Sequence, residues 1–210
     1  MRVLLDDVDL PMVSGSLSSA IDAACDRAAE AGRIIVAGLL DGTLLSERQL
    51  TSPDPDGTSG NELRLYSAEP RTLVLEALEA AATSLEQAEE VQQLAAGELH
   101  RGRTAAALEP VAVAMDLWRA VHEALTHSAE LLNISLAEFS SSLSGDGPSV
   151  AQRAGELAGV LASLKRALEI EDWSAVSDLL GHDLSEQVSV WRGILTLLAR
   201  RVREAQSVGR

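Results

Sequence analysis

Aromatic residues are scarce in this chain of 210 residues, where they make up 2% of the sequence. A cavity lined by aromatic rings, for a cofactor or for nucleic-acid bases, is therefore not expected. Alanine and leucine provide the packing instead, which favours helices that approach each other closely. The hydrophobic content of 46% is ordinary for a globular protein, and the length suffices for one large or two small domains with a buried core.

Cysteine and long apolar runs are also scarce. Cys25 is the only cysteine, so no disulfide can form within the chain, and its place among alanines of a predicted helix indicates a small core residue. No apolar run approaches the length of a membrane span, and no basic-then-apolar leader is present at the N-terminus. We therefore expect a cytoplasmic protein.

Basic residues number 17 against 32 acidic ones, which gives a net charge of −15. A surface of this sign repels the phosphates of nucleic acids and of anionic membranes, so neither is an expected partner. The negative charge has two interpretations: it keeps the protein soluble, or it attracts a basic protein partner.

Residues 1–69 show the pattern of short strands around one helix. Ser16 is the predicted N-cap of that helix and Gly32 closes it. Asp41-Gly42, between two apolar runs, predicts a tight hairpin. The expected strands are 2–5, 8–13, 33–37, the two arms of the hairpin at 39–45, and 62–66. A single helical turn is expected at 46–50.

This order of elements resembles the ubiquitin-like β-grasp fold. The segment from Ile35 to Ser46 is similar to the hairpin and short helical turn of that family, and Leu63-Arg64-Leu65 is similar to its closing strand. The resemblance covers about the first 68 residues and implies a compact module that docks partners through its sheet face. Conjugating members end in a processed Gly-Gly, whereas this chain continues through Glu69-Pro70, so conjugation is not implied. An unrelated α+β domain of the same size is the alternative.

Residues 71–210 show helical spacing almost throughout, and we predict a bundle of two helical hairpins with a linker at about 140–148. The first helix spans about 71–100, with an apolar stripe that extends from Val74 through Val91 to Leu99, and it ends at Arg101-Gly102-Arg103. Further apolar stripes extend from Leu108 to Leu132, from Val150 to Leu168 after Pro148, and from Leu184 to Leu198. Together the two regions predict an α+β protein with a domain 1–70 and a domain 71–210.

Two segments resemble parts of a tetratricopeptide repeat. Gly102–Leu108 with Ala114–Leu117 is similar to the second helix of that repeat, and Glu171–Val176 is a weaker match to the same opening. Two half-matches are too few for a solenoid, which needs about three repeats to bury its faces. A closed bundle is the better prediction.

Charged residues gather on two of the helices. The first carries Glu76, Glu79, Glu86, Glu89, Glu90 and Glu98 on its polar side. This acidic 76–98 face is either solvated or a docking strip for a basic partner. Arg200, Arg201 and Arg203, near the end of the last helix, complement its dipole or form an internal or dimer contact with the acidic face.

No residue is nominated as catalytic, cofactor-binding or metal-binding. His122 and His127 lie five positions apart, about 140° round a helix, and cannot readily share one ion. Gly145-Asp146-Gly147 lacks the preceding strand and following lysine of a phosphate loop. His100 and His182 are interpreted as surface residues beside turns. The tryptophans fall on apolar stripes and are expected to pack in the core: Trp118, Trp173 and Trp191.

These observations favour a non-enzymatic adaptor that binds a protein partner, with no cofactor. The alternative is an acidic helical chaperone of the secretion or flagellar-export type, which holds a basic or helical partner. A homodimer is compatible with either function, because the long first helix can leave an apolar edge uncovered.

Overall fold

The computed structural model describes residues 1–11, 16–52, 60–134 and 149–207. The chain divides into two compact units, Met1–Leu73 and Val74–Arg210. The first contains a mixed sheet and the second is helical, so the predicted α+β fold class is confirmed. The division falls one turn inside the first long helix, three residues after the change of sequence pattern at Pro70.

The elements of the N-terminal unit follow in the order that the sequence predicts. They are β1 (Arg2–Leu5), β2 (Val8–Asp9), α1 (Leu17–Glu30), β3 (Ile34–Leu40), β4 (Thr43–Leu44), α2 (Glu47–Thr51) and β5 (Glu62–Ala68). Ser16 caps α1 through its side chain, and Ser46 forms a capping box with Gln49 at the start of α2.

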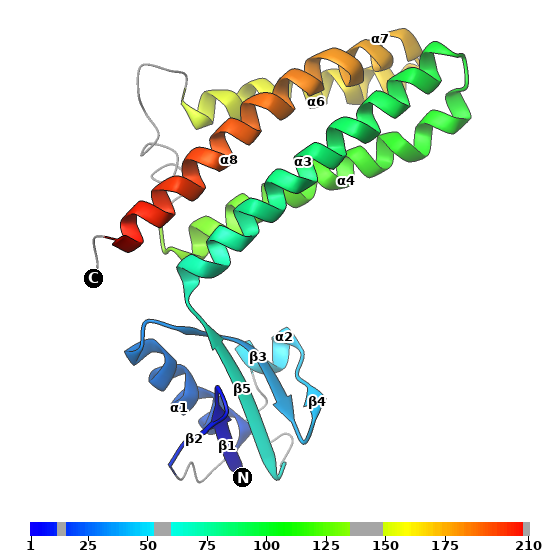
Figure 1. Cartoon of the computed structure of the whole chain (residues 1–210). Coiled ribbons are helices and arrows are strands. Elements are labelled where there is room, and N and C mark those ends of the chain that lie inside the picture. The colour runs from blue at the N-terminus through cyan, green and yellow to red at the C-terminus, as the bar shows by residue number, and fades with distance from the viewer. Residues whose placement is uncertain (12–15, 53–59, 135–148, 208–210) are drawn as a thin grey trace. The chain divides into compact units, whose positions relative to one another are not determined.

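The sheet has the strand order β2-β1-β5-β3-β4, with β5 in the middle (Figure 1). β1 and β5 are parallel, and every other neighbouring pair is antiparallel. Each antiparallel edge pair is closed by a tight turn whose residues have positive φ: Asp6 and Asp7 between β1 and β2, and Asp41 and Gly42 between β3 and β4.

The core of the N-terminal unit lies between one face of the sheet and α1. Leu63 and Leu65 of β5 are fully buried there, and α1 contributes Leu17, Ile21 and small alanines. Gly38 of β3 faces the same core, because a Cβ at this position would come within 2.9 Å of the Leu65 side chain. The close approach of β3 to this core therefore requires glycine at position 38.

The helical unit is built mainly of long helices. They are α3 (Pro70–His100), α4 (Thr104–Leu131), α6 (Val150–Glu169), α7 (Trp173–Asp178), a π-helical segment η1 (Leu179–Asp183) and α8 (Leu184–Ser207). Gly102, at φ 68°, makes the turn between α3 and α4 that the sequence predicts. α4 continues through Pro110. α6 is capped by Ser149, one residue before its start, and the predicted linker 140–148 lies outside the described residues.

α3 runs beside α8 in the opposite direction, as Figure 1 shows. Residues seven apart on α3 provide the polar contacts along this pair, which is the spacing of one helix face. The contacts are Glu79 with Arg203, Glu86 with Arg192 at 2.5 Å, Gln93 with Ser185 at 2.8 Å, and His100 with Ser177 of α7 at 2.8 Å. The interpretation of Arg203 as an internal contact is confirmed.

The apolar stripe of α6 is less completely covered than those of α3 and α8. Leu164 and Ala167 are its buried residues, whereas Leu157, Val160 and Leu161 are half-buried. The sequence predicts the stripe but not its partial exposure.

One expectation for a single residue is wrong. Cys25 is exposed on α1, where a core position was expected. The buried face of α1 consists of Ala20, Ala24 and Ala28 with Leu17 and Ile21, and Cys25 is one position, or about 100° of helix, away from Ala24. His100 is exposed, as predicted for a surface residue beside a turn, and its ring contacts Ser177.

Candidate docking surfaces

The sheet of the N-terminal unit has a second face, turned away from α1, which we call the outward sheet face. Side chains alternate along β5, so that Leu63, Leu65 and Ser67 are buried while Arg64 and Tyr66 point the other way. Paired residues on neighbouring strands lie on the same face, which extends this assignment to the other strands.

A row of side chains crosses the outward sheet face on four strands. Leu4 of β1 pairs with Arg64 of β5, Arg64 pairs with Leu39 of β3, and Leu39 pairs with Leu44 of β4. Leu44 is 69% exposed, which is unusual for a leucine in a strand. The adjacent pair, Ala37 with Tyr66, enlarges the apolar part of this face.

Ion pairs balance the charges near this row. The Arg64 guanidinium contacts Glu62 at 2.7 Å and Asp7 at 3.7 Å, and Arg2 contacts Asp9 at 2.7 Å. The hydrogen bond from Arg2, with a smaller contribution from its charge, holds the pKa of Asp9 below its usual value. Because each guanidinium is matched by a carboxylate, apolar contact is the main interaction that this face offers.

A polar cluster fixes the β1–β2 turn against β5. The Asp6 carboxylate accepts hydrogen bonds from the Ser67 hydroxyl at 2.5 Å and from the Ser67 backbone N–H at 2.8 Å. Arg33 donates to the Ser67 hydroxyl at 2.7 Å and lies 3.6 Å from Asp6. The hydrogen bonds from Ser67, with a smaller contribution from the charge of Arg33, lower the pKa of Asp6. We interpret this cluster as structural.

An open cavity of about 440 Å³ lies between α4, α6 and α8 in the helical unit. Its walls are mainly apolar and come from facing positions on the three helices. They include Met115 and Trp118 of α4, Leu157, Ala158 and Leu161 of α6, and Trp191 of α8. The half-buried stripe of α6 thus forms one wall of this cavity.

Two of the three tryptophans line the cavity and belong to the core as well. Trp118 and Trp191 are each 5% exposed, so the expectation of core packing is correct for both. Their indole N–H groups are buried and have no hydrogen-bond partner among the described residues. A buried donor without an acceptor is costly and uncommon in folded proteins.

The acidic 76–98 face is only partly available to a partner. Glu79 and Glu86 bind arginines of α8, and Glu98 is held by Arg101 and Arg103 with its side chain 13% exposed. The other three glutamates, Glu76, Glu89 and Glu90, make no ion pair with a described residue. Half of the face therefore stabilises the bundle itself.

The histidines do not assemble into a metal centre. His122 is exposed at the wall of the cavity and His127 is exposed further along α4. Among the described residues, no three His, Cys, Asp or Glu side chains gather closely enough to hold an ion. The segment Gly145-Asp146-Gly147 lies outside the described residues.

Cys25 has surroundings that disfavour its thiolate. Partial burial, followed by the charges of Asp22 and Asp26, raises the pKa of the thiol. Because the thiolate is the reactive form, this cysteine is a poor nucleophile at neutral pH.

The β-grasp resemblance implied docking through the sheet face but named none of its residues, and sequence reasoning missed the cavity between α4, α6 and α8 altogether. The Leu39–Leu44 pair could have been found by counting alternation outward from the Asp41-Gly42 turn, which places both leucines on the same face. The gathering of Trp118 and Trp191 has no sequence signal, because it depends on how α4 and α8 pack.

Comparisons with known proteins add no assignment: a scan of protein-family models, a search of curated proteins and a search of solved structures each return no match. Within the described ranges, no helix combines the length and apolar character needed to cross a membrane.

Proposed function

We propose that this chain is a non-enzymatic adaptor that binds a protein partner through the outward sheet face of its N-terminal unit. The Leu44 end of the row carries the proposal: Leu44 is 69% exposed and lies beside the half-buried Leu39, while Leu4 at the other end is buried. Residues that a folded domain leaves exposed in this way are typical of interaction surfaces when they form a contiguous patch.

The arrangement of the sheet supports a β-grasp-like module. Its first and last strands are parallel neighbours, and one helix packs on the opposite face. The resemblance to ubiquitin-like domains implies docking through the sheet, which agrees with the place of the apolar row. The tetratricopeptide resemblance adds less, since Gly102 makes a simple helix-to-helix turn.

A chain with one substitution on this face tests the proposal. Leu44→Arg places a charge in the row, and an edge strand accommodates arginine readily, so the fold should persist. Val8→Arg is the matched control: Val8 is 66% exposed on the other edge strand and pairs with the core-facing Leu5.

Both full-length variants would be used beside the natural chain for affinity capture from native lysate, with quantitative mass spectrometry. We expect the natural chain and Val8→Arg to capture the same partner in similar amounts. Leu44→Arg should bind that partner at least about tenfold more weakly, because burying an unpaired charge in the interface costs more than about 1.4 kcal/mol. Equal retention by all three chains would argue against docking through this face.

A chaperone that holds a partner helix remains the second candidate, and the half-exposed stripe of α6 favours it. A substitution in that stripe, such as Val160→Arg, tests this second function. The function would be supported if Val160→Arg abolished capture of the partner while Leu44→Arg left it unchanged. Homodimer formation stays a prediction, which light scattering over a concentration series would test.

A further inference from the structure

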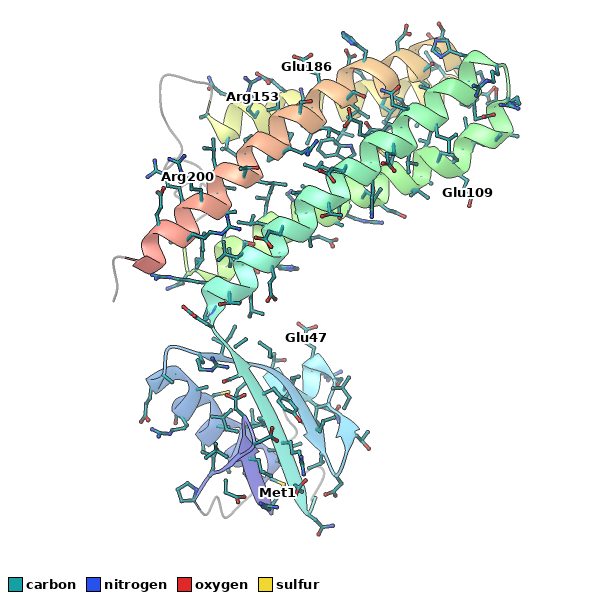
Figure 2. All side chains as sticks on the ribbon, viewed as in Figure 1. Met1, Glu47, Glu109, Arg153, Glu186 and Arg200 are labelled. Atoms are coloured by element: carbon teal, nitrogen blue, oxygen red, sulfur yellow. The ribbon has the colours of Figure 1, made fainter. Side chains whose placement is uncertain are left out.

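The outward sheet face has two halves that differ in charge. The strands β3 and β4, which we call the β3–β4 half, contain no charged residue. The other half, on β1, β2 and the first part of β5, carries the ion pairs of Arg2 and Arg64. Glu47, the first residue of α2 after β4, points away from β3 and β4 (Figure 2). A partner on the β3–β4 half therefore meets uncharged side chains.

A β-bulge interrupts the pairing of β3 with β5. The register passes from the pair Ile35–Ser67 directly to the pair Ala37–Tyr66, so Val36 is an extra residue without a partner in β5. Ser67 is buried on the core face, and Ile35 opposite it packs against the core. Val36 and Ala37 both stand opposite Tyr66, which places their two side chains on its face of the sheet, the outward one.

Val36 extends the apolar part of this face along β3. Its side chain is 43% exposed and does not belong to the core cluster of the unit, as its outward position requires. Ala37 and Leu39, both half-buried, continue the outward side of β3 towards Leu44. A contiguous apolar strip thus extends from Val36 along β3 to Leu44 on β4, with a large exposed side chain at each end.

The bulge and the net charge limit what can cover this strip. A strand added to the free edge of β3 would need a regular row of backbone N–H and C=O groups, and a bulge is one of the features that prevent such pairing. A second copy of this chain is disfavoured by repulsion, since each copy has a net charge of −15. The strip is therefore suited to side-chain contact with an uncharged, apolar segment of a different protein.

We propose that the β-bulge makes Val36 a specificity-determining residue of the docking face, and that the partner covers the β3–β4 half with uncharged apolar side chains. The ion-paired half, with Arg2, stays outside this contact. The inference rests on the proposed adaptor function, because it concerns the same sheet face. It goes further, since it identifies which half of the face binds and the chemistry of the partner's contact surface.

Arginine substitutions in the full-length chain test this assignment. Val36→Arg should lower capture of the partner from native lysate at least about tenfold, as expected for Leu44→Arg. Val113→Arg is the matched control, because Val113 is 41% exposed on α4 of the helical unit, and it should leave capture unchanged. The melting temperature of each variant should equal that of the natural chain, which separates a lost contact from a lost fold.

The outcomes distinguish this inference from the adaptor proposal. Loss of the partner with Leu44→Arg but full capture with Val36→Arg would overturn the inference and leave the adaptor proposal intact. Full capture with both variants would overturn both. An equal loss with Val113→Arg would assign the effect to the added charge and would likewise overturn the role of Val36.

Photo-crosslinking of the full-length chain compares the two halves without adding a charge. A photoreactive amino acid at position 36 should give the same adduct as one at position 44, whereas one in place of Arg2, whose side chain is 56% exposed on β1, should give none. Adducts from position 2 without adducts from position 36, or adducts between two copies of this chain, would overturn the assignment.

Salt provides an independent measurement of the contact chemistry. Capture by the natural chain should change less than about threefold between about 50 and 500 mM sodium chloride, because salt screens exposed charges and leaves apolar contacts in place. A steep loss of capture over this range would show that the charged half of the face takes part, and would overturn the inference.

Discussion

The two units bury their cores by different means, although alanine and leucine dominate both. In the N-terminal unit, every second residue of β5 is buried and side chains such as Asp6 and Asp41 fix the turns by bonding backbone N–H groups. In the helical unit, long apolar helix faces form the core, several buried polar groups have no partner among the described residues, and the apolar face of α6 is only partly buried. The sheet unit is distinguished by its exposed Leu44, whereas the bundle has an open apolar cavity between α4, α6 and α8.

The largest expected effect tests whether the two cores are separate. Leu65→Ala removes a fully buried side chain from the sheet core and should cost the N-terminal unit about 2–5 kcal/mol. Hydrogen exchange of the full-length chain should show faster exchange in β3 and β5 and unchanged exchange in α3 and α8. Leu85→Ala, equally buried in α3, should give the reverse pattern. Loss of protection in both units from either substitution would mean that they unfold as one.

A second prediction concerns the unpaired polar groups of the bundle. The Gln92 side chain is fully buried and neither atom of its amide has a partner among the described residues. Gln92→Leu keeps a side chain of similar volume and removes the cost of burying an unpaired amide. It should therefore stabilise the helical unit by about 1–2 kcal/mol, measured by urea denaturation.

Its neighbour provides the control for this substitution. Gln93 is exposed and donates to the Gly181 carbonyl and to Ser185, so Gln93→Leu should be neutral or slightly destabilising. Destabilisation by Gln92→Leu would indicate that its amide has a partner or ligand in solution.

A third prediction uses pH to separate the units. The pKa of Asp6 is lowered in the folded state, so its interactions stabilise the sheet unit above the ordinary aspartate pKa of about 3.9 and are lost as the pH falls through the lower folded value. Because the side chain is 41% exposed, the contribution at pH 7 is about 1 kcal/mol.

Asparagine can also adopt the positive φ of 50° at this position, so Asp6→Asn isolates the charge. Hydrogen exchange between pH 5 and pH 3 should show acid-dependent loosening of β1 and β5 in the natural chain and less of it in Asp6→Asn. The same pH dependence in both chains would rule out Asp6 as its source.

The smallest effect is expected for the ion pairs between α3 and α8. Glu86 and Arg192 are both about half exposed, so a double-mutant cycle with alanine should give a coupling of about 0.5 kcal/mol that disappears in high salt. A coupling above about 2 kcal/mol that persists in salt would show that this contact is a main determinant of the bundle.

Much of the fold could be predicted because its signals are local. Asp41-Gly42 specified a hairpin, Ser16 and Gly32 bounded α1, and the stripe from Val74 to Leu99 identified the buried side of α3. One residue of that stripe, Val91, is only half-buried, and Gln92 beside it is buried instead. Helical spacing alone cannot resolve a shift of one position when neighbouring helices determine which side is covered.

The candidate surfaces were harder to predict because they depend on packing between distant segments. Counting outward from the Asp41-Gly42 turn pairs Leu39 with Leu44, but only the register of β5 with β3 and β1 shows that Arg64 and Leu4 lie on the same face. Trp118 and Trp191 lie 73 positions apart on separate helices, and their meeting at one cavity follows from the packing of α4 against α8. The exposed position of Cys25 likewise depends on which side of α1 meets the sheet.

The most direct test of the adaptor account is site-specific photo-crosslinking of the full-length chain in native lysate. A photoreactive amino acid would replace Leu44 in one preparation and Val8 in another, since both side chains are similarly exposed on edge strands. The account predicts a discrete crosslinked partner from position 44 and none from position 8. The same adducts from both positions, or none from position 44, would contradict docking through the outward sheet face.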